Sequence, residues 1–153
     1  MTRRPTLVPM AHYETGFVSP KPIAEVYGYL ADFTNATEWD DNTESVRCLT
    51  GDPLALGARY EVVTKFGGRT LTLVYETVTL EEPHRVVLQC ESGPVRIEDT
   101  MTFAETAGGT EVHYRAQIYP KGPAKLLDPV FHLIFQAVGG RAAKGLKQAL
   151  GAS

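Results

Sequence analysis

Residues 22–39 read PIAEVYGYLADFTNATEW, and within this stretch the chain changes from an extended to a helical pattern. Apolar residues recur here at the spacing of one helix face, namely Ile23, Val26, Tyr27 and Leu30. Pro22 suits the first helical position, where no N–H is needed, so the pattern predicts a helix that ends near Asp32. The threonines and the asparagine that follow cap or turn readily, which predicts one more short helical turn before Trp39.

An alternating segment precedes these two helices. Between residues 12 and 17, Tyr13 and every second residue after it share one face, which predicts a half-buried strand. Residues 1–10 mix proline, arginine and threonine without periodicity, so we expect a flexible N-terminal segment there. Met10 is a candidate start of translation besides Met1.

Short turns that contain glycine or proline divide the next part of the chain into strand-like runs. The six runs cover residues 44–49, 58–66, 69–80, 85–91, 95–105 and 110–119. Gly67 and Gly68 can adopt the positive φ angles that a tight hairpin requires. Consecutive strands joined in this way predict an antiparallel meander.

The last part of the chain returns to helical periodicity. Asp128 before Pro129 predicts a capped helix, and PAKLL at 123–127 is either a short preceding helix or one side of a kink. A helix from Pro129 onward would be roughly 33 Å long, enough to cross a small sheet. Gly139 and Gly140 weaken a helix interior, so a kink or a close backbone contact is expected there. One apolar stripe contains Phe131, Phe135, Val138, Ala142, Leu146 and Ala149.

Composition restricts the class of protein. With 43% hydrophobic and 22% charged residues, the chain of 153 residues matches an ordinary globular protein, and we expect a single domain over residues 11–153. The net charge of -3 and the lack of a basic block argue against a nucleic-acid partner. Because no apolar run suits a signal peptide or a transmembrane segment, we expect a cytoplasmic location.

The cysteines and histidines do not form a metal or disulfide pattern. Cys48 and Cys90 are far apart in the sequence and no histidine lies near them at a ligand spacing, so free thiols are expected. The histidines are scattered over a strand, a turn and a helix without metal-ligand spacing. We therefore predict neither a metal nor another cofactor.

The order of elements, together with PIAEVYGYLADFTNATEW, GARYEV at 57–62 and GGTEVHY at 108–114, resembles the SRPBCC superfamily, whose members are START-like and birch-pollen-allergen-like proteins. The likeness covers nearly all of residues 12–150 and is greatest to the polyketide cyclase/dehydrase and lipid-transport branch. It implies an α+β helix-grip fold, in which a curved antiparallel sheet of about seven strands wraps around a long C-terminal helix. Two short helices follow the first strand, and a deep apolar cavity lies between sheet and helix.

Asp99 is the candidate for acid or base chemistry. If its strand alternates strictly and Phe103 points inward, the Asp99 side chain points inward as well. Loss of water would then raise the pKa of the carboxyl group and make it a general acid or base. The alternatives are a one-residue bulge, or a rim position in which Asp99 pairs with Arg96 or Arg115.

Trp39 matches the place where, in the family that the chain resembles, the chain re-enters the sheet. Its ring either plugs the end of the core or touches a ligand at the cavity rim. The tyrosines on the strands can offer a hydroxyl group to a ligand or bond a backbone carbonyl instead. The candidate ligand-binding residues are Tyr13, Trp39, Tyr60, Tyr75, Met101, Phe103, Tyr114, Phe131 and Phe135. The opposite strand parity predicts a charged outer face that contains Arg96, Glu98, His113 and Arg115.

Three functions are compatible with these features. The leading hypothesis is a protein that binds or carries a small hydrophobic molecule, such as a lipid, a polyketide-like aromatic or an isoprenoid. The second is a polyketide cyclase, aromatase or dehydratase that uses Asp99 and a cavity tyrosine. The third is a regulatory module whose surface binds a protein partner. The sequence leaves a homodimer open.

Overall fold

The computed structural model describes residues 11–93, 95–120 and 129–152, without the side chains of residues 120 and 129–131. Residues 1–10, and residues 123–128 with the predicted cap and short helix or kink, lie outside this range. In chain order the elements are β1 (Ala11–Ser19), α1 (Ile23–Ala31), the 3-10 turn η1 (Phe33–Asn35), α2 (Ala36–Trp39), β2 (Thr43–Cys48), β3 (Arg59–Phe66), β4 (Arg69–Glu81), β5 (Arg85–Ser92), β6 (Val95–Thr106), β7 (Gly109–Pro120) and α3 (Pro129–Ala149).

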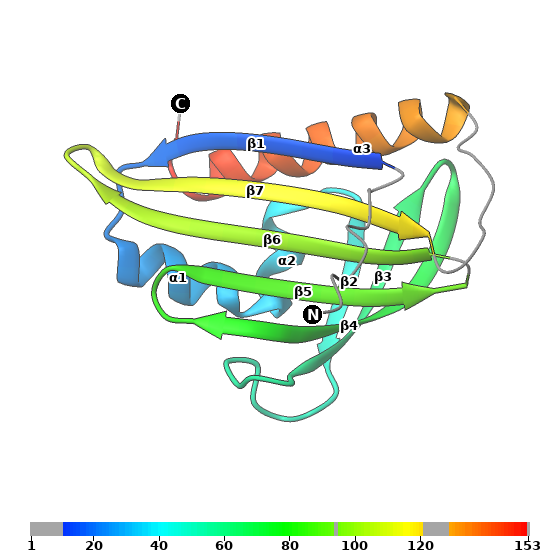
Figure 1. Ribbon diagram of the computed structural model, residues 1–153, viewed down its shortest axis with the longest axis horizontal. Coiled ribbons are helices and arrows are strands. Elements are labelled where there is room, and N and C mark those ends of the chain that lie inside the picture. The colour runs from blue at the N-terminus through cyan, green and yellow to red at the C-terminus, as the bar shows by residue number, and fades with distance from the viewer. Residues whose placement is uncertain (1–10, 94, 121–128, 153) are drawn as a thin grey trace, which may run out of the picture.

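Seven antiparallel strands form one sheet in the order β1-β7-β6-β5-β4-β3-β2. The pairing of β2 to β7 follows the chain order, so the predicted meander is confirmed, and β1 adds to it beside β7. Figure 1 shows the sheet as a curved layer with the helices on its far side. The predicted helix-grip architecture, with two short helices after the first strand, is confirmed.

Two irregularities in strand pairing accompany the curvature of the sheet. The β4–β5 register shifts between Thr77 and Thr79, and the β2–β3 register shifts between Thr43 and Ser45. A bulge of this kind bends the strand and increases its local twist. The pairing of β6 with both of its neighbours runs without a shift, so side chains alternate regularly along this strand.

The helix after β1 begins one residue later than the sequence pattern suggests. Pro22 is the N-cap, because its ψ of 150° is extended rather than helical, and its carbonyl accepts the N–H groups of Glu25 and Val26. The helix ends just before Asp32, as predicted. The Asp32 carboxylate then accepts the N–H of Thr34 and caps η1, so the predicted short turn consists of η1 followed by α2.

The hairpin between β3 and β4 turns on two glycines. Gly67 and Gly68 have φ angles of 59° and 82°, which is the combination that a two-residue hairpin of this type needs. A Cβ at Gly67 would lie 3.0 Å from the Ile134 side chain on α3. The hairpin therefore contacts the N-terminal half of the long helix.

Glycines also allow α3 to lie close to the rest of the protein. A Cβ at Gly139 would overlap with the ring of Tyr13, and one at Gly145 would overlap with the backbone carbonyl of Trp39. Nothing lies within 4 Å of a Cβ at Gly140. The predicted close contact is thus present at Gly139, while α3 continues through both glycines as one helix.

Gly145→Ala is expected to lower the free energy of unfolding by about 1 to 3 kcal/mol, because the added methyl group forces α3 away from Trp39. Gly140→Ala, in the same helix, should instead raise it by about 1 kcal/mol through helix propensity alone. Urea unfolding followed by circular dichroism measures both values. Equal stabilisation by the two substitutions would contradict the close contact at Gly145.

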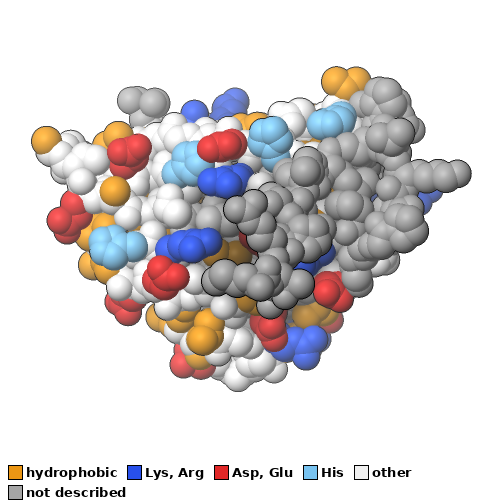
Figure 2. Space-filling model, in the orientation of Figure 1, with side chains coloured by type: hydrophobic (Ala, Val, Ile, Leu, Met, Phe, Trp, Pro, Cys, Tyr) orange, Lys and Arg blue, Asp and Glu red, His pale blue; other side chains and the backbone are white. Residues whose placement is uncertain are grey.

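The convex face of the sheet carries many of the charged side chains, and Figure 2 views the molecule from this side. The His113 Nε2 atom lies 2.6 Å from the Glu14 carboxylate, and the Gln89 side-chain amide donates to Glu98 at 2.8 Å. Such pairs on a partly exposed face contribute little stability. The predicted charged outer face is confirmed for its four residues Arg96, Glu98, His113 and Arg115.

Candidate functional site

A cavity lies between the concave face of the sheet, the α2–β2 connection and α3. The centres of water-sized molecules can occupy about 120 Å³ of it. Its apolar wall consists of Phe33, Trp39, Val62, Phe66, Leu71, Leu73, Ile97, Ala116, Ile118, Phe135, Val138, Gly139 and Ala142. The polar groups in the wall belong to Asp40, Thr43, Thr64, Lys65, Tyr75, Asp99 and Tyr114. An apolar pocket with a few convergent polar groups is the usual form of a small-molecule site.

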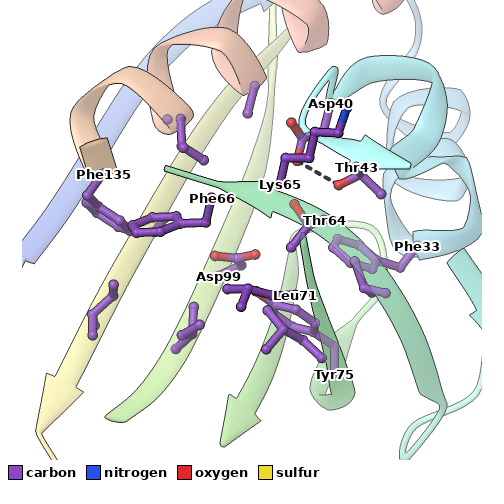
Figure 3. A pocket seen from close by; sticks show the side chains of 18 of the residues that line it. Phe33, Asp40, Thr43, Thr64, Lys65, Phe66, Leu71, Tyr75, Asp99 and Phe135 are labelled. Atoms are coloured by element: carbon purple, nitrogen blue, oxygen red, sulfur yellow. Dashed lines mark hydrogen bonds between the residues drawn. The ribbon is translucent and has the colours of Figure 1, made fainter. Parts of the chain in front are cut away.

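Asp99 points from β6 into this cavity, between the aromatic side chains shown in Figure 3. It lies opposite Leu88 on β5 and opposite Ala116 on β7, in an unbroken register on both sides. The alternative of a bulge in this strand is therefore wrong. Pairing with Arg96 or Arg115 is wrong as well, because strand alternation puts both arginines on the convex face.

Asp99 is only 6% exposed. Burial, followed by the negative charge of Asp40, raises the pKa of its carboxyl group from 3.8 to about 7. A hydrogen bond from the Tyr114 hydroxyl lowers this pKa in part. Both protonation states of Asp99 are consequently populated near neutral pH, which suits a group that accepts and returns a proton.

Two tyrosine hydroxyls face the same space. Burial raises the pKa of Tyr75 and of Tyr114 well above 10, and the Asp99 carboxylate adds to both shifts. Both therefore remain proton donors at neutral pH. Tyr75 is 8% exposed, and among the described residues its hydroxyl has no hydrogen-bond partner. That hydroxyl is available to a molecule in the cavity.

Asp40 lies at the rim of the cavity and holds a loop together. Its Oδ1 accepts hydrogen bonds from the backbone and side chain of Asn42 at 3.0 and 2.8 Å. Its Oδ2 accepts one from Thr43 at 2.9 Å, the bond that is dashed in Figure 3. Burial raises the pKa of Asp40, whereas these hydrogen bonds lower it. The Asn42 amide also donates to the Val138 carbonyl of α3 at 3.1 Å. Asp40 thus positions the loop that connects α2 to β2 and that contacts α3 through Asn42.

An aromatic cluster forms the inner end of the cavity. The Phe33 ring centroid lies 5.5 Å from that of Tyr75 and 6.2 Å from that of Trp39, and Trp39 lies 6.1 Å from Tyr114. Trp39 is 2% exposed, so it plugs the core, and it also lines the cavity. A plug of the core and a residue of the cavity wall, the two roles predicted for Trp39, are therefore compatible in this one position.

Two of the candidate tyrosines lie on the concave side but away from the cavity wall. The ring of Tyr13 packs against Gly139 of α3 and borders a separate surface groove. Tyr60 is buried, and its hydroxyl donates to the carbonyl of Pro53 in the β2–β3 loop. That bond directs the hydroxyl away from the cavity.

Met101 and Phe103 are buried farther along β6, where α1 covers the sheet. The Phe103 ring packs edge-on against Tyr27 of α1 at 5.8 Å. Neither residue lines the cavity. Phe135 does line it, whereas the side chain of Phe131 lies outside the described part of the chain.

Sequence reasoning did not single out several residues of the wall. Val62, Leu73 and Ala116 share the strand parity of Tyr60, Tyr75 and Tyr114, so that pattern identifies them as inward-facing. Asp40 lies in a loop with no periodicity, and no sequence signal indicates its hydrogen bonds.

The described parts of the chain contain no cluster of three or more His, Cys, Asp or Glu side chains arranged to hold a metal ion. Cys48 and Cys90 are free thiols, as expected. No helix in the described ranges is both long and apolar enough to cross a membrane.

Solved structures share this fold. A START superfamily protein from Mycobacterium smegmatis matches with a TM-score of 0.73 at 10% identity, over 92% of this chain and 97% of its own. The Zhui aromatase/cyclase from a Streptomyces species matches with a TM-score of 0.72 at 18% identity, over 92% and 91% of the two chains. Ara h 8.0201 matches with a TM-score of 0.66 at 16% identity, over 91% and 96%. At these identities the likeness concerns the fold alone.

No curated protein matches the chain in sequence. The family model described as polyketide cyclase / dehydrase and lipid transport matches residues 10–151, a range that includes the sheet, the described helices and the described cavity wall. The resemblance inferred from the sequence is confirmed, and the chain belongs to the polyketide cyclase/dehydrase and lipid-transport family.

Proposed function

We propose that the protein binds a small hydrophobic molecule in the cavity between the sheet and α3. The observation that carries this proposal is the cavity itself, an apolar and aromatic space with one buried carboxyl group and two tyrosine hydroxyls. Membership of a family described by cyclases and lipid transport supports it. The polar groups would orient the ligand, and the apolar wall would supply most of the affinity.

The free volume limits the size of the ligand. At about 120 Å³, the cavity is near the roughly 150 Å³ of an engineered protein cavity that accepts benzene. A molecule with one aromatic ring therefore suits it. A longer lipid or polyketide would require α3 and the β3–β4 hairpin, which meet at Gly67 and Ile134, to move apart.

An enzyme is the second candidate function, and the environment of Asp99 favours it. The carboxyl group has a pKa of about 7, and the neighbouring Tyr114 hydroxyl lowers this pKa in part by acting as a hydrogen-bond donor. As a carboxylate, Asp99 can take a proton from a carbon next to a carbonyl group, and as an acid it can return the proton to a leaving hydroxyl. This pair matches the acid and base required by a cyclase or dehydratase. A regulatory module has less support, because the interior is not filled by side chains.

Benzyl alcohol is a suitable neutral probe, and Trp39, the only tryptophan, reports on the cavity through its fluorescence. We expect benzyl alcohol to change this fluorescence in a saturable manner. Ala116→Leu should weaken the binding at least about tenfold, because the larger side chain fills the space opposite Asp99. Ala104→Leu, an exposed position on the same sheet, should leave binding unchanged.

Thermal melting of both variants establishes that they fold. Equal binding by the wild-type protein and by a folded Ala116→Leu variant would exclude this cavity as the binding site. The cytoplasmic location and the homodimer are still predictions.

A further inference from the structure

We propose that the cavity prefers hydrophobic amines in their protonated form over neutral molecules or carboxylic acids of the same size, and that the ammonium group binds against Asp99 and the surrounding aromatic rings. The inference rests on the proposed function and narrows its ligand class. It is carried by the charges that line the cavity, by the capacity of its buried polar groups for further hydrogen bonds and by the arrangement of its rings.

The charge inside the cavity is negative. Asp40 and Asp99 both line it, and Lys65 is the one basic residue in the described part of the wall. The Lys65 side chain is 63% exposed, and its ammonium group lies 3.2 Å from the Glu44 carboxylate outside the cavity. A carboxylate ligand would therefore meet the Asp99 charge without a buried partner of opposite sign, whereas an ammonium group would meet a complementary one.

Asp99, rather than Asp40, is the group with bonding capacity to spare. Both oxygens of Asp40 already accept hydrogen bonds from its own loop. For Asp99, the Tyr114 hydroxyl is the donor found among the described residues. A carboxylate can accept about four hydrogen bonds. A primary ammonium group offers three donors and can satisfy the free positions on Asp99 and the nearby Tyr75 hydroxyl oxygen.

The rings beside Asp99 favour a cation as well. Phe33, Trp39, Tyr75 and Tyr114 form a connected cluster with centroid separations of 5.5 to 6.2 Å. The faces of aromatic rings attract organic cations, most strongly when water is excluded. The same rings would hold the apolar part of a ligand that contains one aromatic ring.

The groups around Asp99 explain why binding of a cation would compete with protonation of its carboxyl group. Asp40, Tyr114 and Glu98 influence its charge. Cys90 lies on the adjacent strand β5, Tyr75 lies on β4 beyond it, and Lys65 lies at the rim. The residues that α3 contributes to the described wall are Phe135, Val138, Gly139 and Ala142, and none of them is charged. No described group inside the cavity therefore neutralises the Asp99 carboxylate, so near neutral pH either a proton or a ligand ammonium group fills that role.

Benzylamine, benzyl alcohol and benzoate share one ring and differ in the charge of the polar group, so they form a matched set of probes. Their affinities for the intact protein, measured by isothermal titration calorimetry at about pH 8, should follow the order benzylamine, benzyl alcohol, benzoate. We expect at least about a tenfold preference for the amine over the alcohol. Between about pH 8 and pH 6, amine affinity should fall about tenfold as Asp99 takes up a proton, while alcohol affinity changes little.

Asp99→Asn should abolish the preference for the amine while benzyl alcohol still binds. Asp41→Asn, which removes an equal charge from an exposed position near the rim, should retain the preference. Tighter binding of benzyl alcohol or benzoate than of benzylamine in the wild-type protein would overturn the inference and leave the proposed function standing. A preference for benzylamine that persists in Asp99→Asn would likewise overturn the inference and leave the proposed function standing. If none of the three probes binds, both the inference and the proposed function fail.

Discussion

Replacing Trp39 by alanine is expected to lower the free energy of unfolding by about 3 to 5 kcal/mol, because a large buried ring leaves a void that the surrounding elements cannot close. The ring is almost completely buried, contacts Phe33 and Tyr114, and lies where the carbonyl of the same residue meets Gly145 of α3. Its loss would therefore loosen the contacts of α2 with the sheet and with the long helix. Urea unfolding followed by far-ultraviolet circular dichroism gives the value without a tryptophan signal.

Trp39→Phe is the matched control for this substitution. A phenylalanine keeps an aromatic ring against Phe33 and Tyr114, and the indole N–H makes no hydrogen bond with the described residues, so no buried bond is lost. We expect this variant to lose less than about half as much stability as the alanine variant. If the alanine variant unfolds at the wild-type urea concentration, the account of Trp39 as the plug of the core is incorrect.

The stability contributed by Asp99 is expected to decrease by about 4 kcal/mol as the pH rises from about 4 to about 7. Burial raises the pKa of Asp99 from 3.8 to about 7 in the folded protein, so within this window the folded state holds a proton that the unfolded state has released. The contribution is therefore fully present below the ordinary pKa of 3.8 and is lost once the pH passes the folded value. Above that pH the folded protein contains a buried carboxylate, which is unfavourable unless a cation joins it.

The difference between the wild-type protein and Asp99→Asn measures this contribution, because the other carboxyl groups titrate in both. Urea unfolding at several pH values should show that the free energy of unfolding of the variant, relative to that of the wild type, rises by about 4 kcal/mol across the window. Asp41→Asn, at an exposed position, should instead give a curve parallel to that of the wild type. Parallel curves for Asp99→Asn and wild type would mean that the Asp99 carboxyl group is hydrated in the folded protein.

Much of the fold follows from short-range patterns. Strict alternation along residues 95–103 would turn Asp99 inward, one of the possibilities that the sequence left open, and the unshifted register of β6 shows that this one is present. The paired glycines at 67 and 68 likewise predict the hairpin, since few other residues adopt two successive positive φ angles. The one error at the start of α1 concerns Pro22, whose extended ψ makes it the cap of the helix.

The candidate site was predicted less completely. Tyr60 and Tyr75 have the same strand parity and lie directly opposite each other in the sheet, yet only Tyr75 borders the cavity. The hydroxyl of Tyr60 is instead bonded to Pro53, in a loop whose path no periodicity describes. Phe103 faces inward too, but α1 covers it before the cavity begins.

The sequence by itself therefore determined where the chain turns and which side chains alternate toward the interior, whereas an inward Asp99 was one of the positions that it left open. Only the tertiary structure decided which of those inward residues surround an empty space, and that Asp40 is held at its rim by its own loop. The physical reason is that orientation along a strand or helix depends on the adjacent backbone, whereas a void depends on how closely distant elements approach. Here that distance is set by glycines such as Gly145, which allow α3 to touch Trp39 while space remains beside Asp99.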